Sequence, residues 1–189
     1  STLSDLLAAI CAAAPGVRIR LGSLEPRTVT EGFCRTLAGC PNLCPQFHLS
    51  LQSGSDTVLR RMHRKYDTAR YAESVRLLHE YFPGCAVTTD LIVGFPGETE
   101  EEFSETLDFV RKARFLAVHV FAYSRRKNTP AATFPGQVPE SVKHERSARL
   151  IALCREIGEE ILSEIVSSGE TLPVVFETRE GEFFTGHSD

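Results

Sequence analysis

The sequence predicts an α/β fold built on a parallel sheet, and two observations carry this prediction. Segments with period-two alternation of apolar residues and segments with helical spacing follow one another in regular order along the 189-residue chain. The connections between the strand segments are long enough for the helical crossovers that parallel strands need. Four parallel strand segments are visible, fewer than a closed eight-unit barrel requires, so we expect a partial TIM-like barrel.

The first part of the chain alternates helix and strand. Ser55 stands where a side-chain cap would begin a short helix, and Pro83-Gly84 ends a strongly amphipathic one. The predicted elements are a helix at 3–14, a strand at 17–24, a weakly helical stretch at 27–38, a strand at 46–52 and helices at 55–62 and 68–82.

The second part continues the alternation and then changes character. Thr99 and Glu102 have the spacing of a capping box, and Gly169 follows a long helix. The predicted elements are strands at 86–94 and 116–123, helices at 99–114 and 139–167, and a β-hairpin at 172–184. We therefore expect residues 1–168 to form the partial barrel and residues 169–189 to begin an all-β domain that is cut short.

The composition is that of a soluble globular protein, with 42% hydrophobic and 24% charged residues. No apolar run is long enough for a bilayer and no leader pattern is visible, so we expect a cytoplasmic protein without a membrane partner. The net charge of -4 gives no global attraction to polyanions and favours no DNA contact. Two local basic runs exist, although runs this short are more often solvated surface. They are Arg60, Arg61, Arg64 and Lys65, and Arg125, Arg126 and Lys127.

Each strand segment carries polar side chains on one face, because side chains alternate along a strand. These polar residues are Arg18, Arg20, His48, Ser50, Gln52, Thr88, Asp90, His119 and Tyr123. Parallel strands covered on both faces should be apolar throughout. The recurrence favours a polar ligand cavity on the concave side of the sheet. The alternative is that each polar residue is a satisfied core group or faces solvent.

Two segments, 51–56 and 90–99, follow strand ends, where functional residues of parallel α/β folds gather. Within the second, the run Gly94-Phe95-Pro96-Gly97 combines flexible and fixed backbone positions, against which a flat ring such as adenine could lie. The acidic helix start at 98–102 repels phosphate. The same run could equally be a tight βα turn.

Four segments resemble the radical S-adenosylmethionine methylthiotransferases in order and spacing. They are RIRLGSLEP, HLSLQSGSDTVLRRMHRKY, TTDLIVGFPGET and HVFAYSRRKNTPAA. The branch that acts on threonylcarbamoyladenosine in tRNA is the most similar one. Members of this family bind a four-iron four-sulfur cluster through Cys-x-x-x-Cys-x-x-Cys, carry a second such cluster and use S-adenosylmethionine as the radical source. The resemblance thus implies S-adenosylmethionine as cofactor, tRNA as partner, and addition of a methylthio group next to the anticodon as activity.

The cysteine pattern departs from that of the family. Cys40-x-x-x-Cys44 supplies two of the three ligand positions, but Phe47 stands at the third, and a carbon ring cannot replace a thiolate. A zinc site formed with Cys34 would have spacings that match no usual zinc motif. We therefore expect that Cys40 and Cys44 hold no metal and that the two clusters belong to other parts of a full-length enzyme. The chain by itself is then inactive, with no catalytic residue of its own.

The resemblance also implies cofactor contacts. Arg64 matches a position that takes a carboxylate in two parallel hydrogen bonds, and Asp90 matches one that accepts from ribose hydroxyls. Without the resemblance, Arg64 could be a plain surface cation. The full set implied for S-adenosylmethionine is Glu25, Gln52, Ser53, Arg64, Asp90, Ile92, Gly94, Phe95 and Pro96.

A substrate side is implied as well, in the loop after the last parallel strand. Its residues are Tyr123, Ser124, Arg125, Arg126 and Lys127, of which the cations could meet tRNA phosphates. The terminal hairpin resembles the first strands of the small RNA-binding β-barrel (TRAM) of the family. Two other interpretations stay open: a methylthiotransferase that acts on a ribosomal-protein side chain, and a non-catalytic RNA-binding module.

Overall fold

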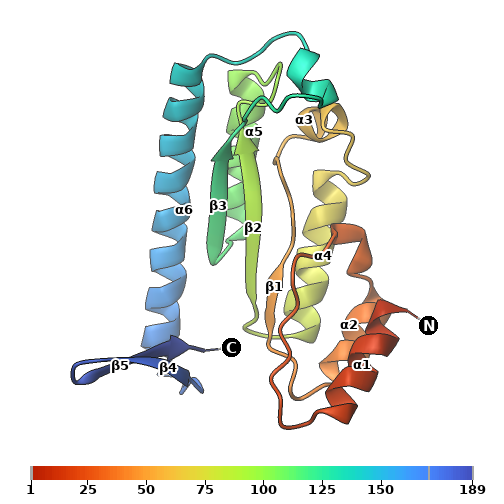
Figure 1. The fold of residues 1–189 in the computed structure, drawn as a ribbon, viewed down its shortest axis with the longest axis vertical. Coiled ribbons are helices and arrows are strands. Elements are labelled where there is room, and N and C mark those ends of the chain that lie inside the picture. The colour runs from red at the N-terminus through yellow and green to blue at the C-terminus, as the bar shows by residue number, and fades with distance from the viewer. Residues whose placement is uncertain (1, 170, 189) are drawn as a thin grey trace.

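A computed structural model describes residues 2–169 and 171–188, and a parallel sheet lies at its centre (Figure 1). The strands are β1 (Gln46–His48), β2 (Ala86–Val93) and β3 (Ala117–Ala122). They are hydrogen-bonded in the order β1-β2-β3, and both pairings are parallel. This confirms the predicted α/β class with a parallel sheet.

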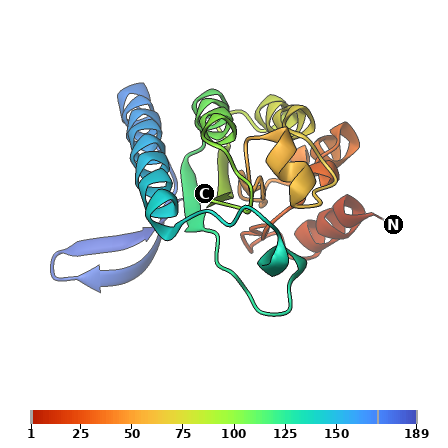
Figure 2. The same ribbon diagram turned by 90° about the horizontal axis from the view of Figure 1, so that it is seen from above.

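The helices connect the strands and cover one face of the sheet. They are α1 (Leu3–Ala13), α2 (Glu31–Ala38), α3 (Asp56–Arg61), α4 (Thr68–Tyr81), α5 (Glu100–Ala113) and α6 (Glu140–Ser168), with short 3-10 turns η1 (Pro26–Thr28) and η2 (Pro130–Thr133). Figure 2 shows α4, α5 and α6 in an arc along one side of the strands, with the segment around η2 on the opposite side. None of the described helices combines the length and the apolar character that a membrane crossing requires.

Helix boundaries follow local signals in the sequence. Thr99 caps α5, and Glu102 returns a bond to the Thr99 amide, which confirms the predicted capping box. Gly169 ends α6 in the left-handed conformation at φ 68°. Ser55 is the N-cap of α3 but makes no side-chain capping bond, because its hydroxyl pairs with Thr57 at 2.9 Å.

The two faces of the sheet differ as the alternation predicts. Phe47, Leu49 and Leu51 are fully buried, and burial alternates strictly along β2, where Thr88 and Asp90 stand on the half-exposed face. The apolar faces meet the helices in one core. The polar faces of β1 and β2 therefore share one side of the sheet, as expected for a hollow on its concave side.

The predicted strand at 17–24 is wrong in the described structure. This segment touches the 43–49 segment only through two isolated parallel bridges, Ile19 with Leu43 and Leu24 with Leu49. The offset between partners grows by one residue from the first bridge to the second, so no continuous ladder forms. Pro45 lies between them and has no amide hydrogen to donate.

The predicted strand at 46–52 is regular only over β1. Beyond His48 the hydroxyl of Thr89 enters the ladder, accepting from the Leu51 amide at 3.0 Å and donating to the Leu49 carbonyl at 2.5 Å. Gln52 then turns into the left-handed region at φ 71° while its amide still donates to the Asp90 carbonyl at 2.9 Å. The backbone thus continues alongside β2 as far as Gln52, but without regular strand geometry.

The terminal hairpin is confirmed as β4 (Val175–Glu180) paired antiparallel with β5 (Phe183–His187). Its large apolar side chains are exposed, among them Phe176, Phe183 and Phe184. Three residues of the predicted domain ranges 1–168 and 169–189 lie outside the described residues. They are residues 1, 170 and 189. The assignment of 169–189 to a separate β-domain stays a prediction.

Candidate functional site

The carboxyl ends of the parallel strands open into a cavity of about 470 Å³. Its polar wall comes from the end of the β1 line (Gln52), from β2 (Asp90) and from the loop after β3 (Ser124, Arg126). Ile92 and Tyr123 supply apolar and aromatic surface. A mixed cavity at this edge of a parallel sheet has the character of a small-molecule site.

A second cavity of about 380 Å³ adjoins the first, because both are lined by Ile92, Tyr123, Thr129 and Ala131. Its basic residues are Arg61, His63 and Arg64, and its aromatic ones are Phe95, Tyr123 and Phe134. Two buried polar atoms have no hydrogen-bond partner among the described residues and belong to side chains of this wall: Nε of Arg61 and the hydroxyl of Tyr123. Unpaired buried groups of this kind are costly unless a ligand or water meets them.

The 129–134 segment around η2 borders both cavities and is held by side chains. Arg125 donates from Nε to the Ala132 carbonyl at 2.6 Å, and Gln137 donates to the Ala131 and Phe134 carbonyls at 3.1 and 2.9 Å. Phe134 meets the edge of Phe95 at 6.2 Å between ring centroids. This segment therefore has a fixed path across the strand ends.

Eight of the predicted cofactor- and substrate-side residues line these cavities. They are Gln52, Asp90, Ile92, Tyr123, Ser124 and Arg126 in the first, and Arg64 and Phe95, with Ile92 and Tyr123 again, in the second. The structure brings them together from positions up to 74 residues apart in the sequence (52 to 126). What they bind stays a prediction.

Other predicted residues do not line either cavity. Glu25 is exposed and pairs with Arg27 at 3.2 Å. Ser53 is buried, and its hydroxyl lies 3.4 Å from that of Thr106 on α5. Arg125 is engaged with the Ala132 carbonyl, which gives it a role in loop structure.

The remaining three are backbone or surface positions. Gly94 and Pro96 are buried in the turn after β2, and Lys127 is exposed. Gly94 has φ +71°, and a side chain there would collide with the stem of Lys143. A glycine is thus required at this turn for the packing of α6.

Sequence reasoning missed the two buried cations of α6. Lys143 donates to the Tyr123 carbonyl at 3.0 Å and to Glu140 at 2.7 Å. Arg146 pairs with Glu98 at 2.7 Å, with both side chains less than a tenth exposed. The signal was present, because Lys143 and Arg146 continue the buried helical stripe of Leu150.

Glu98 completes the turn after β2. Its carboxylate accepts from the Gly94 amide at 2.8 Å, and Arg146 also donates to the Glu98 carbonyl at 3.1 Å. Burial raises the pKa of Glu98, while the Gly94 amide and Arg146 act in the opposite direction. The two cations of α6 thus fix the strand-end loops that form the cavity walls.

Arg61 is held by α5 rather than by solvent. It donates to both oxygens of Glu102, at 2.9 and 2.5 Å, and Thr57 donates to the same carboxylate at 2.7 Å. The bond to Arg61 is the main cause that lowers the pKa of Glu102 from 4.5 to about 2. One member of the first predicted basic run is therefore neutralised within the fold.

The cysteines are all free thiols. Cys44 is buried and Cys40 is half-buried, and burial, followed by the nearby Cys11, raises the pKa of Cys40. Residues 2–169 and 171–188 contain no group of three or more His, Cys, Asp or Glu side chains placed to hold a metal ion. That Cys40 and Cys44 bind no cluster stays a prediction.

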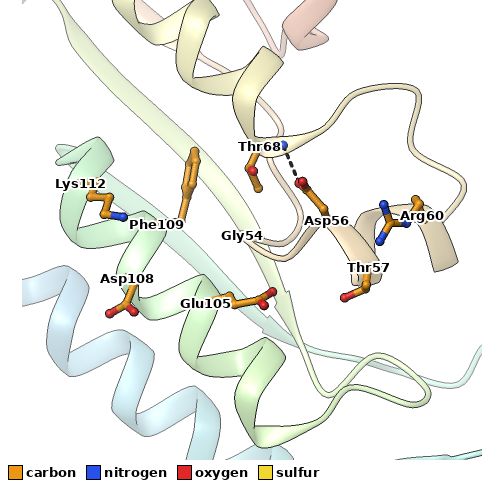
Figure 3. Close-up of a pocket in the computed structure, with 9 residues that line it drawn as sticks. All are labelled: Gly54, Asp56, Thr57, Arg60, Thr68, Glu105, Asp108, Phe109 and Lys112. Carbon is orange, nitrogen blue, oxygen red and sulfur yellow. Dashed lines mark hydrogen bonds between the residues drawn. The ribbon is translucent and has the colours of Figure 1, made fainter.

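A separate cavity of about 500 Å³ lies on the outer side of the sheet (Figure 3). Asp56 and Arg60 of α3 line it together with Glu105, Asp108 and Lys112 of α5. Asp56 accepts from the Thr68 amide at 2.8 Å and so joins α3 to the start of α4. None of the predicted site residues lines this cavity.

Comparison with known proteins identifies the family. The profile of the radical SAM superfamily matches residues 2–110. The tRNA-2-methylthio-N(6)-dimethylallyladenosine synthase of Acidothermus cellulolyticus is 47% identical over 161 residues, which are 81% of this chain and 32% of that protein. The threonylcarbamoyladenosine tRNA methylthiotransferase of Bacillus subtilis is 43% identical over 177 residues, 91% of this chain and 39% of that protein.

Solved structures share the fold at low identity. Coproporphyrinogen III oxidase from Escherichia coli superposes with a TM-score of 0.65 at 18% identity, covering 82% of this chain and 37% of that one. Methylornithine synthase gives a TM-score of 0.56 at 15% identity, covering 79% and 43%.

The sequence relatives confirm the resemblance to the tRNA methylthiotransferases, and the chain spans 32% to 39% of the length of the two relatives described. Because the matching profile covers more than half of its residues, the chain belongs to the radical SAM superfamily.

Proposed function

We propose that this chain forms the cofactor- and substrate-facing part of a radical S-adenosylmethionine enzyme that adds a methylthio group to a modified adenosine of tRNA. The observation that carries the proposal is the convergence of Gln52, Asp90, Ile92 and Tyr123 on one cavity at the strand ends. The names of both relatives support it, since both denote methylthio modification of tRNA. We place this activity in the cytoplasm.

The cavity residues fit S-adenosylmethionine. A nucleoside with a charged amino acid tail needs hydroxyl partners, an apolar surface for the base and a cation for the carboxylate. Gln52 and Asp90 offer partners for the hydroxyls, and Ile92 and Phe95 offer an apolar surface for the base. Arg64 offers a cation for the carboxylate. The unpartnered Tyr123 hydroxyl supplies one further polar group at the junction of the two cavities.

The residues of the chain bind and orient rather than react. S-adenosylmethionine, when bound, supplies the sulfonium carbon from which radical chemistry starts. Asp90 would hold the ribose, Arg64 would hold the carboxylate, and the aromatic rings of Phe95, Tyr123 and Phe134 would supply an apolar wall beside them. Positioning of this kind is the contribution that a protein makes to cofactor chemistry.

Residues 2–169 and 171–188 contain no group of three or more His, Cys, Asp or Glu side chains placed to hold an iron–sulfur cluster. We propose that the two clusters are bound elsewhere in a longer enzyme and that this chain alone is inactive. Its coverage of 32% to 39% of the two relatives leaves room for such parts.

The tRNA side of the site follows from the loop after β3. Arg126 lines the first cavity and Lys127 is exposed beside it. Cations at the rim of a nucleoside cavity give affinity for phosphates without reading the sequence. We propose that both meet the backbone next to the modified base.

The substituent on the adenosine separates two candidates. We propose threonylcarbamoyl, because the relative that carries this name aligns with 91% of the chain. Dimethylallyl is the second candidate, favoured by the 47% identity of the other relative.

Mass spectrometry of tRNA nucleosides decides between them. A strain that lacks the complete gene should lose the methylthio form of threonylcarbamoyladenosine and regain it on complementation. Loss of only the methylthio dimethylallyl form would favour the second candidate. Unchanged tRNA together with a ribosomal protein that is lighter by a methylthio group would contradict both.

Binding measurements test the cofactor residues separately. In the cluster-loaded full-length enzyme, Asp90→Ala and Arg64→Ala should each weaken S-adenosylmethionine binding about tenfold, since each removes a hydrogen bond that involves a charged group. Calorimetry gives the affinities. Wild-type affinity in both variants would reject the assignments.

A further inference from the structure

A row of polar side chains runs beneath the first cavity on the concave face of the sheet. Gln46 and His48 come from β1, and Thr88 and Asp90 come from β2. Gln46 donates from Nε2 to the Thr88 hydroxyl at 3.1 Å. His48 lies 3.1 Å from the same hydroxyl through Nδ1 and 3.3 Å from Oδ2 of Asp90 through Nε2.

Because the Thr88 oxygen accepts from Gln46, its own hydrogen can be donated to Nδ1 of His48. In that arrangement Nδ1 is the acceptor of the imidazole, and Nε2 carries the hydrogen that points to Asp90. With this tautomer, His48 donates from Nε2 to Oδ2 of Asp90.

His48 is placed to act through Asp90 and not on a ligand directly. Asp90 lines the first cavity, whereas His48 lines neither cavity and is 16% exposed at the side chain. The contact with His48 is made through Oδ2 of Asp90, and Oδ1 takes no part in it. His119, the register partner of Asp90 on β3, lies on the other side of this carboxylate, with its ring 6.3 Å from that of His48.

We propose that His48 is a positioning residue: the Gln46–Thr88–His48 row fixes the rotamer of Asp90, so that its free oxygen accepts from a ribose hydroxyl. This rests on the proposed function, which supplies the nucleoside. A carboxylate held by a donor on one oxygen keeps the other in place, and a fixed acceptor loses less entropy on binding.

The test uses the cluster-loaded full-length enzyme and two inert ligands, S-adenosylhomocysteine and its 2′,3′-dideoxy analogue. His48→Leu should weaken S-adenosylhomocysteine binding about tenfold, the effect of one lost charge-assisted hydrogen bond, and leave the analogue unaffected. His48→Gln, which can still donate to Asp90, should restore most of the loss. In an Asp90→Asn background, His48→Leu should have no further effect.

His144→Leu is the matched control, because His144 is exposed on α6. If His48→Leu does not fold, His48→Asn serves instead, since the shorter amide reaches Thr88 but not Asp90. Nitrogen chemical shifts of His48 in the ligand-free chain give a second readout. They should report the Nε2–H tautomer in the wild type and a tautomer mixture after Thr88→Val.

The outcomes distinguish a failure of the His48 role from a failure of the proposed function. If the wild-type enzyme binds S-adenosylhomocysteine but His48→Leu weakens both ligands equally, or neither, His48 is not a positioning residue for the ribose contact. An Nδ1–H tautomer in the wild type overturns the direction of the row. If the wild type binds neither ligand, the proposed function itself fails and the ribose role fails with it.

Discussion

The two ends of α6 make the same kind of ion pair in opposite surroundings. Near its start, Arg146 and Glu98 are 7% and 2% exposed and lie 2.7 Å apart. Along its second half, Glu160 and Glu164 meet Arg114, which is 42% exposed, at 3.2 and 2.8 Å. The distances are alike, but only the first pair is removed from water.

The difference concerns what each pair can hold in place. Glu98 also accepts from the Gly94 amide, and Arg146 also donates to the Glu98 backbone, so the buried pair fixes the turn after β2. The guanidinium of Arg114 pairs with the carboxylates of Glu160 and Glu164, which are both more than half exposed. The buried ion pair therefore fixes the structure near the start of α6. The pairs along its second half are exposed surface ion pairs, which contribute little to stability.

The largest effect is expected from Arg146→Leu. Removal of one partner leaves a buried carboxylate unpaired, which costs about 3–5 kcal/mol of unfolding free energy. Urea denaturation measures the loss. A cost no greater than that of Arg114→Leu would remove the contrast between the two ends.

Gly94→Ala should be next, at about 2–4 kcal/mol, because a left-handed backbone and a collision with Lys143 add up. Gly84→Ala is the matched control. Gly84 has nearly the same φ, +76° against +71°, but nothing lies within 4 Å of an added side chain. Equal melting temperatures of the two variants would show that Lys143 does not hold the Gly94 turn.

Lowering the pH should weaken the ion pair between Arg61 and Glu102, whose exposure is intermediate between those of the other two pairs, and so reduce the unfolding free energy. The folded pKa of Glu102, about 2, is below its ordinary value of 4.5, so its contribution is complete above 4.5 and is lost as the pH falls towards 2. With Arg61 about a third exposed, we expect about 1 kcal/mol after screening. Denaturation across this pH range checks it, and the same slope in Arg61→Met would assign the effect to other groups.

Arg114→Leu should have the smallest effect, at most about 0.5 kcal/mol, and salt should reduce it further. Arg114 also has a left-handed backbone at φ 49°, so Arg114→Gly should be neutral or slightly stabilising. Thermal unfolding measures both variants. A decrease in unfolding free energy above about 2 kcal/mol in either one would show that the exposed ion pairs contribute substantially to stability.

Sequence reasoning found most elements because their signals are local. The capping box of Thr99 and Glu102 sets the start of α5 as predicted. The strand at 17–24 was wrong for a non-local reason, since its pairing depends on where Pro45 interrupts the neighbouring segment. The alternation of apolar and polar residues within one segment does not show whether a neighbouring segment can form a continuous ladder with it.

The site residues on the strands were predicted from the alternation of side chains, whereas the supporting residues on α6 were missed. Asp90 and Gln52 were found from the polar faces of their strands, and both line the first cavity. Ser53 was carried over by resemblance, yet its hydroxyl faces Thr106. Arg146 would have required seeing that a cation on a buried helical stripe needs an acid from another element, here Glu98.

The length of α6 sets a scale for anything that contacts both of its ends. Its 29 residues join the loops around the cavity to the terminal hairpin, which stand at opposite ends of the molecule (Figure 1). At the rise of an α-helix this corresponds to a rod of about 43 Å. A molecule that contacts both the cavity and the hairpin must reach across roughly that distance, so the length of α6 sets the minimum span of any such partner.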